Sequence, residues 1–563
     1  MEALNSEPTQ PIGIIPLGGL GEVGMNLMVY RCGEQLLVVD CGLTFPEGDT
    51  PGVDFIIPDT SYLVENRDRV LAIVITHGHE DHQGALPYIW PDLQVPVYCG
   101  AMTLGILEGK LKEHDLLGKV PLILVRQGDR VQIGPFMVHF IPVTHSIIDA
   151  SALAITTPLG TLIHTGDFNI DHTPGDPRVT DLFTLADYGQ RGVLALLSDS
   201  TNVGREGSTA SERIAHESLA QVIPEIRGLA VVALFSSNIR RVRQVLQVAH
   251  ANGRKVILNG RSLVQNVAVA REQGFLDVPP DLLIDVKAID QHPRNKVLVI
   301  STGSQGEPNS SLVRIASGEH REIALRPGDT VILSSRFIPG NERTIWSLVN
   351  RLAHLGAQVI HENNHPRIHV SGHAPREDLK LMLALTRPRY FIPIHGELRH
   401  LHMHRDLAVE MGIPPENTLV ATNGNRLELD ATGLRLDGEV PHGRVFVDGK
   451  GVGDVSDIVL RDRRHLSEDG MVVAVLVVAK DTGVLLEGPE LLTRGVVYED
   501  ENQDLLESAR QAVQEALRLG PKGMDFGEDE EVGIQDLTVR ALRRFFKKRL
   551  GRRPVVLPLV MEM

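Results

Sequence analysis

Cysteine, aromatic side chains and long apolar runs are all scarce in this sequence. Its 563 residues include three cysteines, Cys32, Cys41 and Cys99, an odd number without CxxC spacing, so reduced thiols are expected rather than a disulfide framework. Aromatic residues make up 4% of the chain, which argues against extensive stacking platforms for nucleic acid bases. No basic and apolar leader opens the sequence, and apolar runs such as 472–479 fall well short of the ~20 residues that span a bilayer. We therefore expect a cytoplasmic protein with no membrane partner.

Positive charge is also in deficit. The chain carries 72 acidic against 56 basic side chains, a formal net charge of −16, which excludes a uniformly basic surface and by itself argues against a polyanionic partner. With 42% hydrophobic and 23% charged residues the composition is that of a globular protein. The length predicts two to four domains.

The pattern of predicted strands and helices changes along the chain and suggests domain boundaries. The first two hundred residues contain short β-branched strands, several of which end in an acid or a histidine. From Thr209 to His373, helical patterns alternate with apolar runs, which predicts a parallel sheet covered by helices. Strands then return, and the last segment combines a hairpin, two helices and a final apolar run. We predict four segments: a first domain in two parts, 1–208 and 374–450, an inserted α/β domain, 209–373, and a C-terminal α+β domain, 451–563.

Three glycines near the start, Gly19, Gly21 and Gly24, match the GxGxxG pattern of dinucleotide-binding proteins, and Asp40 lies near the offset of a ribose-binding acid. That pattern requires a helix after the third glycine, whose N-terminus holds the pyrophosphate. Here the sequence continues as a second strand, so we predict a strand–turn–strand path. The glycines are expected to permit close backbone approach instead.

The strongest chemical motif follows a predicted strand and reads HxHxDH. It contains His77, His79, Asp81 and His82, and imidazole and carboxylate ligands suit zinc or manganese. Four such groups in one loop exceed the needs of a single open catalytic metal, so two divalent metal ions are predicted, with zinc favoured and manganese as the alternative.

Further ligands are expected at the ends of other strands. His145, Asp167 and His395 each follow a short apolar run. Taken singly, each could be an ordinary capping or turn residue, but together with HxHxDH they favour a metal site.

These residues resemble the metallo-β-lactamase superfamily, whose fold is an αβ/βα sandwich and whose first conserved position is matched by Asp40. The resemblance implies that one metal is held by His77, His79 and His145, the other by Asp81, His82 and His395, with Asp167 bridging. Two cations in this arrangement activate a hydroxide and stabilise an in-line displacement at phosphorus.

Three more motifs narrow the resemblance. The segments around Asp199 (SDST), 369–373 (HVSGH) and His395 (PIHGE) resemble the additional motifs of the β-CASP nucleases, which carry an inserted domain. A histidine at the third of these motifs implies RNA rather than DNA as substrate. The motif order, the GLGEVGMN start and the C-terminal α+β domain resemble the bacterial ribonuclease J family.

That family resemblance implies a ribonuclease acting on single-stranded RNA in RNA maturation and decay. It implies 5′-to-3′ exonuclease activity that favours 5′-monophosphate ends, together with endonuclease activity. It also implies a homodimer or higher oligomer formed through the C-terminal domain, and RNA-degradation or ribosome-associated partners. If the family resemblance holds, we expect a locally positive channel between the first two domains on a surface that is otherwise acidic, with a net charge of −16.

Phosphodiester cleavage also needs a proton for the leaving oxygen. We expect His369 to supply it, with Asp199 orienting the imidazole, against the alternative that His369 is a structural histidine. Asp81 is a candidate proton shuttle as well as a ligand.

Two kinds of loop are candidates for RNA contact. Ser371, Gly372 and His373 offer a hydroxyl, a backbone NH and an imidazole that suit a phosphate oxygen. The resemblance implies that the whole HVSGH segment grips the RNA backbone: His369, Val370, Ser371, Gly372 and His373. Ser236, Arg240 and Ser304 stand at or near predicted helix N-termini, which attract phosphates, although ordinary capping explains them equally well.

Rival functions remain on the same sequence. A small-molecule hydrolase of the same fold leaves the large insert unexplained, and a DNA nuclease is disfavoured by His395. A non-catalytic RNA-binding scaffold is disfavoured by the complete ligand set.

Overall fold

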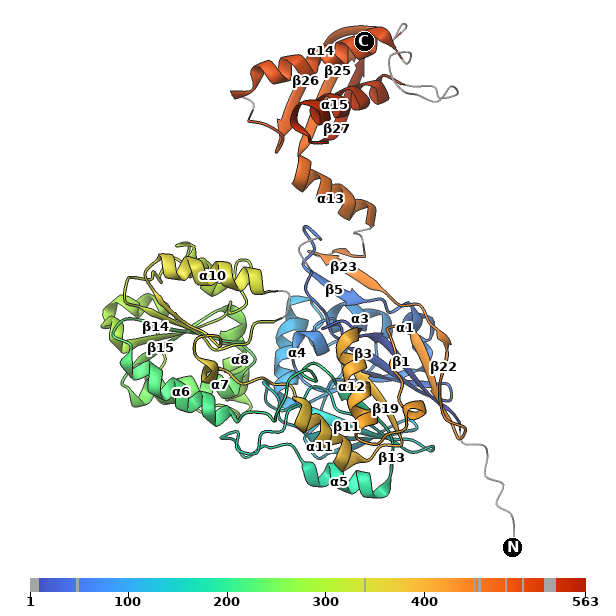
Figure 1. Ribbon diagram of the computed structural model, residues 1–563, viewed down its shortest axis with the longest axis vertical. Helices are drawn as coiled ribbons and strands as arrows, with labels where there is room; N and C mark the ends of the chain where they lie inside the picture. Colours follow the sequence, from blue (N-terminus) through green and yellow to red (C-terminus); the bar gives the residue numbers. More distant parts are fainter. Residues whose placement is uncertain are drawn as a thin grey trace. The chain divides into compact units, whose positions relative to one another are not determined.

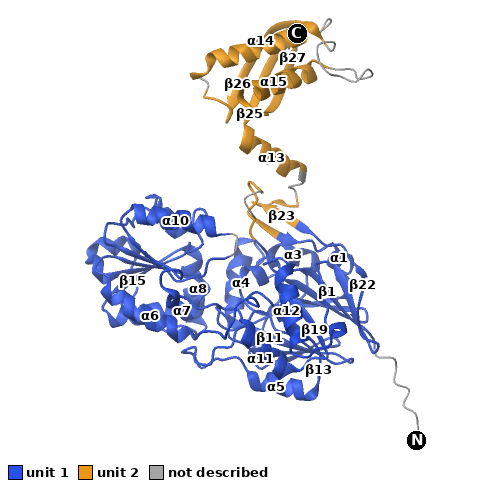
Figure 2. Cartoon of the chain, in the orientation of Figure 1, with its two compact units in different colours: residues 1–44, 57–444 blue, residues 45–56, 445–563 orange. Residues whose placement is uncertain are grey.

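The computed structural model describes residues 10–46, 50–338, 341–449, 451–453, 457–480, 484–498, 501–520 and 533–563. The chain divides into two compact units, residues 1–44 with 57–444 and residues 45–56 with 445–563 (Figure 2). Within the described ranges, every helix is too short or too polar to cross a lipid bilayer.

The first unit contains two large sheets that share one hydrophobic core (Figure 1). The first sheet has the order β22-β21-β1-β3-β4-β6-β7-β8: β22 (Leu434–Glu439), β21 (Asn425–Leu429), β1 (Ile12–Gly18), β3 (Leu27–Cys32), β4 (Gln35–Val39), β6 (Val70–Val74), β7 (Val97–Cys99) and β8 (Leu122–Leu124). The second has the order β19-β13-β12-β11-β10-β9: β19 (Tyr390–Ile394), β13 (Val193–Asp199), β12 (Thr161–His164), β11 (Ser151–Thr156), β10 (Phe136–Pro142) and β9 (Arg130–Ile133).

The core of this part lies between the two sheets. Ile14 and Leu37 of the first sheet share one buried cluster with Phe140, Leu153 and Leu197 of the second. In the chain, α1 (Ser61–Glu65) precedes β6, α2 (Glu80–Gln83) and α3 (Leu86–Leu93) follow β6, and α4 (Ala101–Glu113) follows β7. The helices α5 (Leu182–Arg191), α11 (Arg376–Thr386) and α12 (Leu398–Glu410) pack on the second sheet. The αβ/βα sandwich predicted from the sequence is confirmed.

Several strands end at the same edge of this sandwich. β12, β13 and β19 are mutually parallel, and β10 runs in the same direction because two antiparallel pairings connect it to β12. In the facing sheet, β4 and β6 are parallel. The residues that follow β6, β10, β12, β13 and β19 therefore converge, which explains why chemistry-bearing side chains stand just after these strands.

The GxGxxG segment forms no helix. β1 pairs directly with β3, and the short β2 (Leu20–Gly21) in between pairs with β20 (Gly396–Glu397), so the predicted strand–turn–strand path is confirmed. Gly19 has φ +88°, and a Cβ there would lie 2.3 Å from Asn26 Oδ1. The glycine thus makes room for Asn26, whose Nδ2 reaches to 3.1 Å from His82 Nε2.

The inserted part is a parallel five-stranded sheet with helices on both faces. Its order is β15-β16-β14-β17-β18: β15 (Lys255–Asn259), β16 (Val297–Ser301), β14 (Ala230–Ala233), β17 (Thr330–Leu333) and β18 (Gln358–Ile360). One face is covered by α6 (Glu212–Glu225), α7 (Ile239–Ala251) and α8 (Arg261–Glu272), the other by α9 (Ser311–Ala316) and α10 (Glu342–His354). Met102 and Ile147 from the sandwich join the cluster beneath α7, so the two parts share apolar core.

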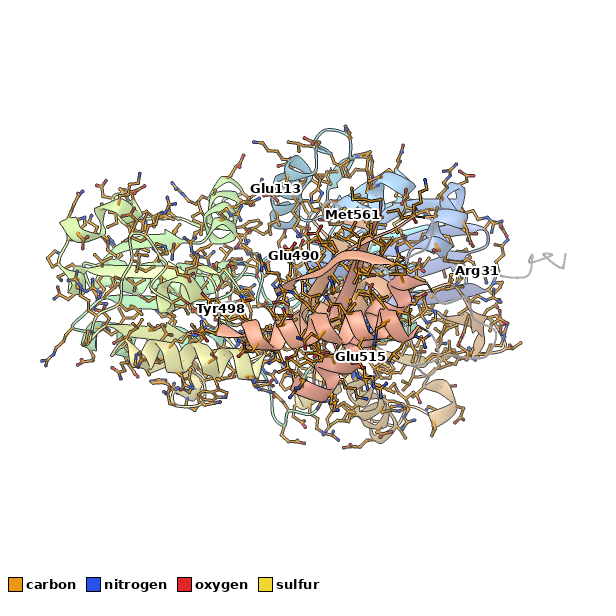
Figure 3. The ribbon with its side chains drawn as sticks, turned by 90° about the horizontal axis from the view of Figure 1, so that it is seen from above. Arg31, Glu113, Glu490, Tyr498, Glu515 and Met561 are labelled. Carbon is orange, nitrogen blue, oxygen red and sulfur yellow. The ribbon has the colours of Figure 1, made fainter. Side chains whose placement is uncertain are left out.

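The second unit is an α+β domain, as predicted. Its sheet has the order β26-β25-β27, with β25 (Met471–Val478) antiparallel to β26 (Leu485–Arg494) and parallel to β27 (Val555–Glu562). The helices α14 (Gln503–Leu519) and α15 (Ile534–Leu550) pack on one face, and Figure 3 labels Glu515 on α14 and Met561 on β27. A helix not predicted from the sequence, α13 (Asp457–Asp469), precedes β25. A small sheet of β24 (Gly451–Val452), β23 (Arg444–Asp448) and β5 (Phe55–Pro58) also forms, largely from residues of this unit.

Candidate active site

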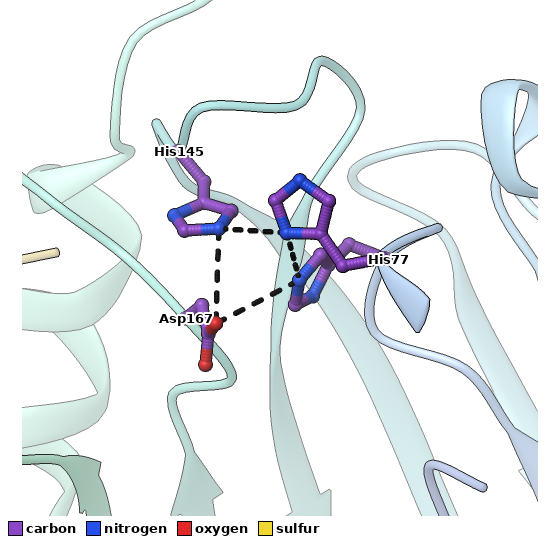
Figure 4. Close-up of side chains that lie close together, drawn as sticks. His77, His145 and Asp167 are labelled. Atoms are coloured by element: carbon purple, nitrogen blue, oxygen red, sulfur yellow. Dashed lines mark hydrogen bonds and ion pairs between the residues drawn. The ribbon is translucent and has the colours of Figure 1, made fainter. Parts of the chain in front are cut away.

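The first of two ligand clusters lies where β6, β10 and β12 end. His79 Nδ1 is 3.1 Å from both His77 Nε2 and His145 Nε2. Asp167 Oδ2 is 3.8 Å from His77 Nε2 and 3.7 Å from His145 Nε2. Figure 4 shows His77, His145 and Asp167 pointing toward one another from separate segments of the chain. Three imidazole nitrogens and one carboxylate oxygen therefore face a common point.

The second cluster shares Asp167 with the first. Asp81 Oδ2 is 3.6 Å from His82 Nε2 and 3.4 Å from His395 Nε2. Asp167 contributes Oδ2 at 3.3 Å from His82 Nε2 and Oδ1 at 3.5 Å from His395 Nε2. All seven side chains that the sequence singled out as metal ligands are thus assembled in two adjoining groups, with one carboxylate common to both.

The protonation pattern of the histidines suits cations in these clusters. His145 Nδ1 donates to the carbonyl oxygen of Gly372 at 2.8 Å, because a carbonyl only accepts. His82 Nδ1 pairs with Asp40 Oδ2 at 2.8 Å. In the neutral imidazole each Nε2 then keeps its lone pair for the cluster. Asp167 Oδ1 is buried and has no hydrogen-bond partner among the described residues, as expected of an oxygen meant for a cation.

The electrostatics point the same way. Burial lowers the pKa of His79 to about 4, and it holds the pKa of His77 and His145 well below the usual range, so these three ligands are neutral near pH 7. In the second cluster burial opposes protonation of His395, but the carboxylates of Asp167, Asp199 and Asp81 outweigh it and raise its pKa to about 10. So strong a negative potential in a buried place favours positive charge, which divalent cations supply.

Each ligand histidine is held by a partner on its outer nitrogen. The five pairs are His77 Nδ1 with Thr76 Oγ1 (3.1 Å), His79 Nε2 with Ser237 Oγ (3.0 Å), His82 Nδ1 with Asp40 Oδ2 (2.8 Å), His145 Nδ1 with Gly372 O (2.8 Å) and His395 Nδ1 with Thr201 Oγ1 (2.6 Å). Such partners fix the ring orientation and the tautomer of a metal ligand. The sequence offered a signal for Thr76 and Thr201, which adjoin motif residues, whereas it marked Ser237 only as part of a predicted helix-capping loop.

A third group adjoins the clusters and corrects one expectation. Asp199 Oδ2 is 2.8 Å from His373 Nδ1, and Asp167 Oδ2 is 3.9 Å from the same nitrogen. Burial opposes protonation of His373, but the charges of Asp199 and Asp167 prevail and raise its pKa. The expected pairing of Asp199 with His369 is wrong, because the carboxylate faces the last histidine of the HVSGH segment instead of the first.

His369 lies in none of the clusters that the described residues form. Burial, reinforced by the nearby guanidinium groups of Arg241 and Arg336, holds its pKa well below the usual range. A histidine that is neutral near pH 7 lacks the acidic proton of the imidazolium form, so the surroundings of His369 fit a structural residue.

The rest of the HVSGH segment is tied down by two asparagines that the sequence did not single out. Asn202 Nδ2 donates to Ser371 Oγ and to the carbonyl oxygen of His373, both at 2.8 Å. Asn169 Nδ2 donates to the carbonyl oxygen of Ser371 at 3.1 Å. Gly372 approaches His145 so closely that a Cβ would lie 2.9 Å from its ring. The Val370 side chain is buried.

The three helix-terminal candidates have different surroundings. Arg240 is 4% exposed and donates from Nη1 to the carbonyl oxygen of His145 at 2.6 Å, and Ser304 is 1% exposed. Both are buried in this structure, which corrects their expected exposure to RNA. Ser236 is half-buried, and its hydroxyl accepts from Asn266 Nδ2 at 3.4 Å. Its neighbour Ser237 is the residue that reaches a ligand.

Four family models match the chain. The metallo-beta-lactamase superfamily model matches residues 20–202 and the model of the Zn-dependent metallo-hydrolase RNA specificity domain matches 364–418. The ribonuclease J beta-CASP domain matches 227–352, and the ribonuclease J C-terminal domain matches 458–563.

Curated proteins similar to this chain are named as ribonucleases J. Ribonuclease J from Thermus thermophilus is 42% identical, with all of this chain and 97% of the relative covered. Ribonuclease J 1 from Streptococcus pyogenes is 40% identical over all of this chain and 99% of its own length. Ribonuclease J2 from Bacillus subtilis is 37% identical over 99% of this chain and 100% of its own.

Among solved structures, a protein of unknown function from Enterococcus faecalis has a TM-score of 0.54 at 18% identity. The match covers 75% of this chain and 100% of that protein. At this level of identity the likeness concerns the fold alone.

Proposed function

The chain belongs to the ribonuclease J family of metal-dependent hydrolases, and from that premise we propose that it hydrolyses phosphodiester bonds of single-stranded RNA with two divalent cations bound side by side. Zinc is the favoured metal, with manganese as the alternative. The activity is proposed to run 5′ to 3′ from 5′-monophosphate ends and also to cut internally.

One observation carries this proposal: Asp167 belongs to both ligand clusters and keeps a buried oxygen without a hydrogen-bond partner among the described residues. A single open catalytic metal needs three protein ligands, whereas here seven side chains surround two adjoining points. Two cations held by these side chains would supply a hydroxide near neutral pH and stabilisation for the charge that develops on the phosphate. A small-molecule hydrolase of the same fold would not need the inserted domain.

The proton for the leaving oxygen is proposed to come from His373. The charges of Asp199 and Asp167 raise its pKa and so favour the protonated ring, which lies beside the shared carboxylate. Asp199 orients the ring from 2.8 Å. This assignment replaces His369 as general acid. Asp81, whose side chain is 30% exposed, connects the clusters to solvent and is suited to release a proton.

RNA is proposed to bind along the loop that precedes His373. Asn202 holds Ser371 and in turn accepts a hydrogen bond from the Arg336 guanidinium. Arg336 and the exposed Arg205 both place positive charge near this loop, as their effect on the pKa of His369 indicates. Such local charge suits a phosphate backbone although the whole chain is acidic.

The homodimer is proposed to form through the open face of the sheet in the second unit. Leu557, Leu559 and Met561 are each about half exposed, and β27 pairs them with Val473, Val475 and Val477 of β25, so all six side chains share one face. The opposite face is covered by α14 and α15. An apolar stripe of this kind is typical of a protein interface.

The test is cleavage of a 5′-phosphorylated RNA by the metal-loaded protein and its variants. His77→Ala and Asp167→Ala are expected to abolish cleavage with folding retained, as judged by circular dichroism. His402→Ala is the matched control, because His402 is exposed on α12 and outside the clusters that the described residues form. Undiminished RNA cleavage in His77→Ala would overturn the proposal, and equal cleavage of a DNA oligonucleotide would favour the rival DNA nuclease.

A further inference from the structure

The N-terminus of helix α7, which belongs to the inserted part, reaches the first ligand cluster. Just before the helix, Ser237 Oγ lies 3.0 Å from His79 Nε2. In its first turn, Arg240 Nη1 donates to the carbonyl oxygen of His145 at 2.6 Å. The insert thus touches two of the three histidines that face the first metal position, one through its ring and one through its backbone.

A second path runs from α7 to the ring of His145. Arg241 is fully buried, pairs with Glu212 at 2.8 Å, and donates from Nη1 to the carbonyl oxygen of Ile368 at 3.1 Å. Ile368 opens the segment in which the Gly372 carbonyl accepts from His145 Nδ1. The helix that supplies Arg240 therefore also anchors the loop that orients the same ligand.

The second cluster has no such connection among its outer-nitrogen partners. His82 is held by Asp40 and His395 by Thr201, and both partners belong to the sandwich. The remaining histidine of the first cluster, His77, is likewise held from within the sandwich, by Thr76. The two metal positions thus differ in whether they depend on the insert.

The tautomer that His79 needs as a metal ligand decides which atom donates in its hydrogen bond with Ser237. His79 turns Nδ1 toward the cluster, so the tautomer that binds metal carries its proton on Nε2. This N–H donates a hydrogen bond to the Ser237 hydroxyl oxygen. Removal of an outer partner of this type typically costs a metal site about 10- to 100-fold in affinity. The Arg240 contact acts on position instead, because a buried guanidinium that bonds a backbone carbonyl fixes where the His145 loop lies.

Resting on the proposed two-metal function, we propose that Ser237 and Arg240 are positioning residues through which the inserted domain controls binding of the first metal, while the second binds independently of it. If contact with the insert strengthens metal binding, metal binding must strengthen that contact by the same factor. Metal in the first position therefore holds the start of α7 against the sandwich, so metal loading and domain placement are coupled.

The test is metal binding to the full-length protein after chelation, with equilibrium dialysis against buffered free Zn²⁺ or Mn²⁺ and elemental analysis. Ser237→Ala is expected to weaken one of the two sites by about 10- to 100-fold and to leave the other unchanged. Ser236→Ala is the matched control and is expected to bind both metals as the wild type does, since Ser236 bonds Asn266 and no ligand. Ser237→Thr keeps the hydroxyl and is expected to restore the weakened site.

Two further measurements separate the possible outcomes. Thr201→Val is expected to weaken the site that Ser237→Ala spares. Hydrogen exchange of residues 235–241 is expected to slow when metal is added to the wild type and to slow less in Ser237→Ala. Equal weakening of both sites by Ser237→Ala, unchanged binding, or identical protection in both proteins would overturn the inference. A wild type that binds no metal would instead overturn the proposed function.

Discussion

Replacing Asp199 by Asn is predicted to remove the charge that contributes most to the raised pKa of His373. The carboxylate lies 2.8 Å from His373 Nδ1, closer than Asp167 at 3.9 Å, and is the larger of the two contributions that raise the pKa of this buried ring. Loss of one such charge lowers a histidine pKa by about 1–3 pH units. Only Asp167 then remains to oppose the effect of burial, so the pKa of His373 should fall.

The kinetic consequence follows from the sign of that change. A general acid whose pKa falls is depleted of its proton at a lower pH, so the alkaline limb of the pH–rate profile moves toward acid. For every pH unit that the limb moves, the rate at a fixed pH on that limb falls about tenfold. We predict that kcat for RNA cleavage at pH 7.5 falls about 10- to 1,000-fold in Asp199→Asn, while KM changes little.

The assay is steady-state cleavage of a 5′-phosphorylated fluorescent RNA between pH 5.5 and 9. Metal content is measured in parallel, because Asp199 Oδ1 also lies 3.4 Å from His395 Nδ1. If the pair acts as a unit, the double variant Asp199→Asn/His373→Gln is no slower than His373→Gln alone. His369→Gln is the control. Additive losses, an unchanged pH–rate profile in Asp199→Asn, or a greater loss in His369→Gln than in His373→Gln would refute the reasoning.

Three other predictions concern stability and assembly. Chelation is expected to lower the melting temperature, since each metal at a free concentration 100 times its Kd stabilises the fold by about 2.7 kcal/mol; an unchanged melting curve would contradict this. Burial lowers the pKa of His404 to about 3, so between pH 6.5 and 3 only the unfolded state takes up this proton. Stability should then fall by about 1.4 kcal/mol per pH unit on acidification, and His404→Gln should flatten the slope seen in urea titrations at several pH values. Leu559→Glu is expected to convert the dimer to monomer in sedimentation experiments, with Leu550→Glu, on the helical layer, as the control that stays dimeric.

The metal ligands were predictable because their signals are local. His77, His79, Asp81 and His82 lie within six residues, and the other ligands follow short apolar strands whose direction the fold shares. Alternation of apolar strands with helices predicts parallel strands, and parallel strands end at the same edge of a sheet. The layered fold and the parallel insert follow from the same alternation of strands and helices.

The proton donor was not predictable in the same way. His369 and His373 stand in one motif, and only the tertiary contact with Asp199 distinguishes them. The role of Arg240 was equally hidden, since a basic residue in the first turn of a helix has the same sequence signature whether it faces solvent or a buried carbonyl. The sequence places Ser237 at a predicted helix start but gives no signal for its contact with His79, which spans 158 positions of the chain.

The central claim is that the chain cleaves RNA only when the ligands around Asp167 hold two divalent cations. The most direct test starts from chelated protein and follows the rate of RNA cleavage as free Zn²⁺ or Mn²⁺ is raised. We predict no cleavage without metal and a rate that rises with the square of the metal concentration at its lowest values, because both positions must be filled. Cleavage by the metal-free protein, or saturation with a single bound metal per chain, would contradict the account.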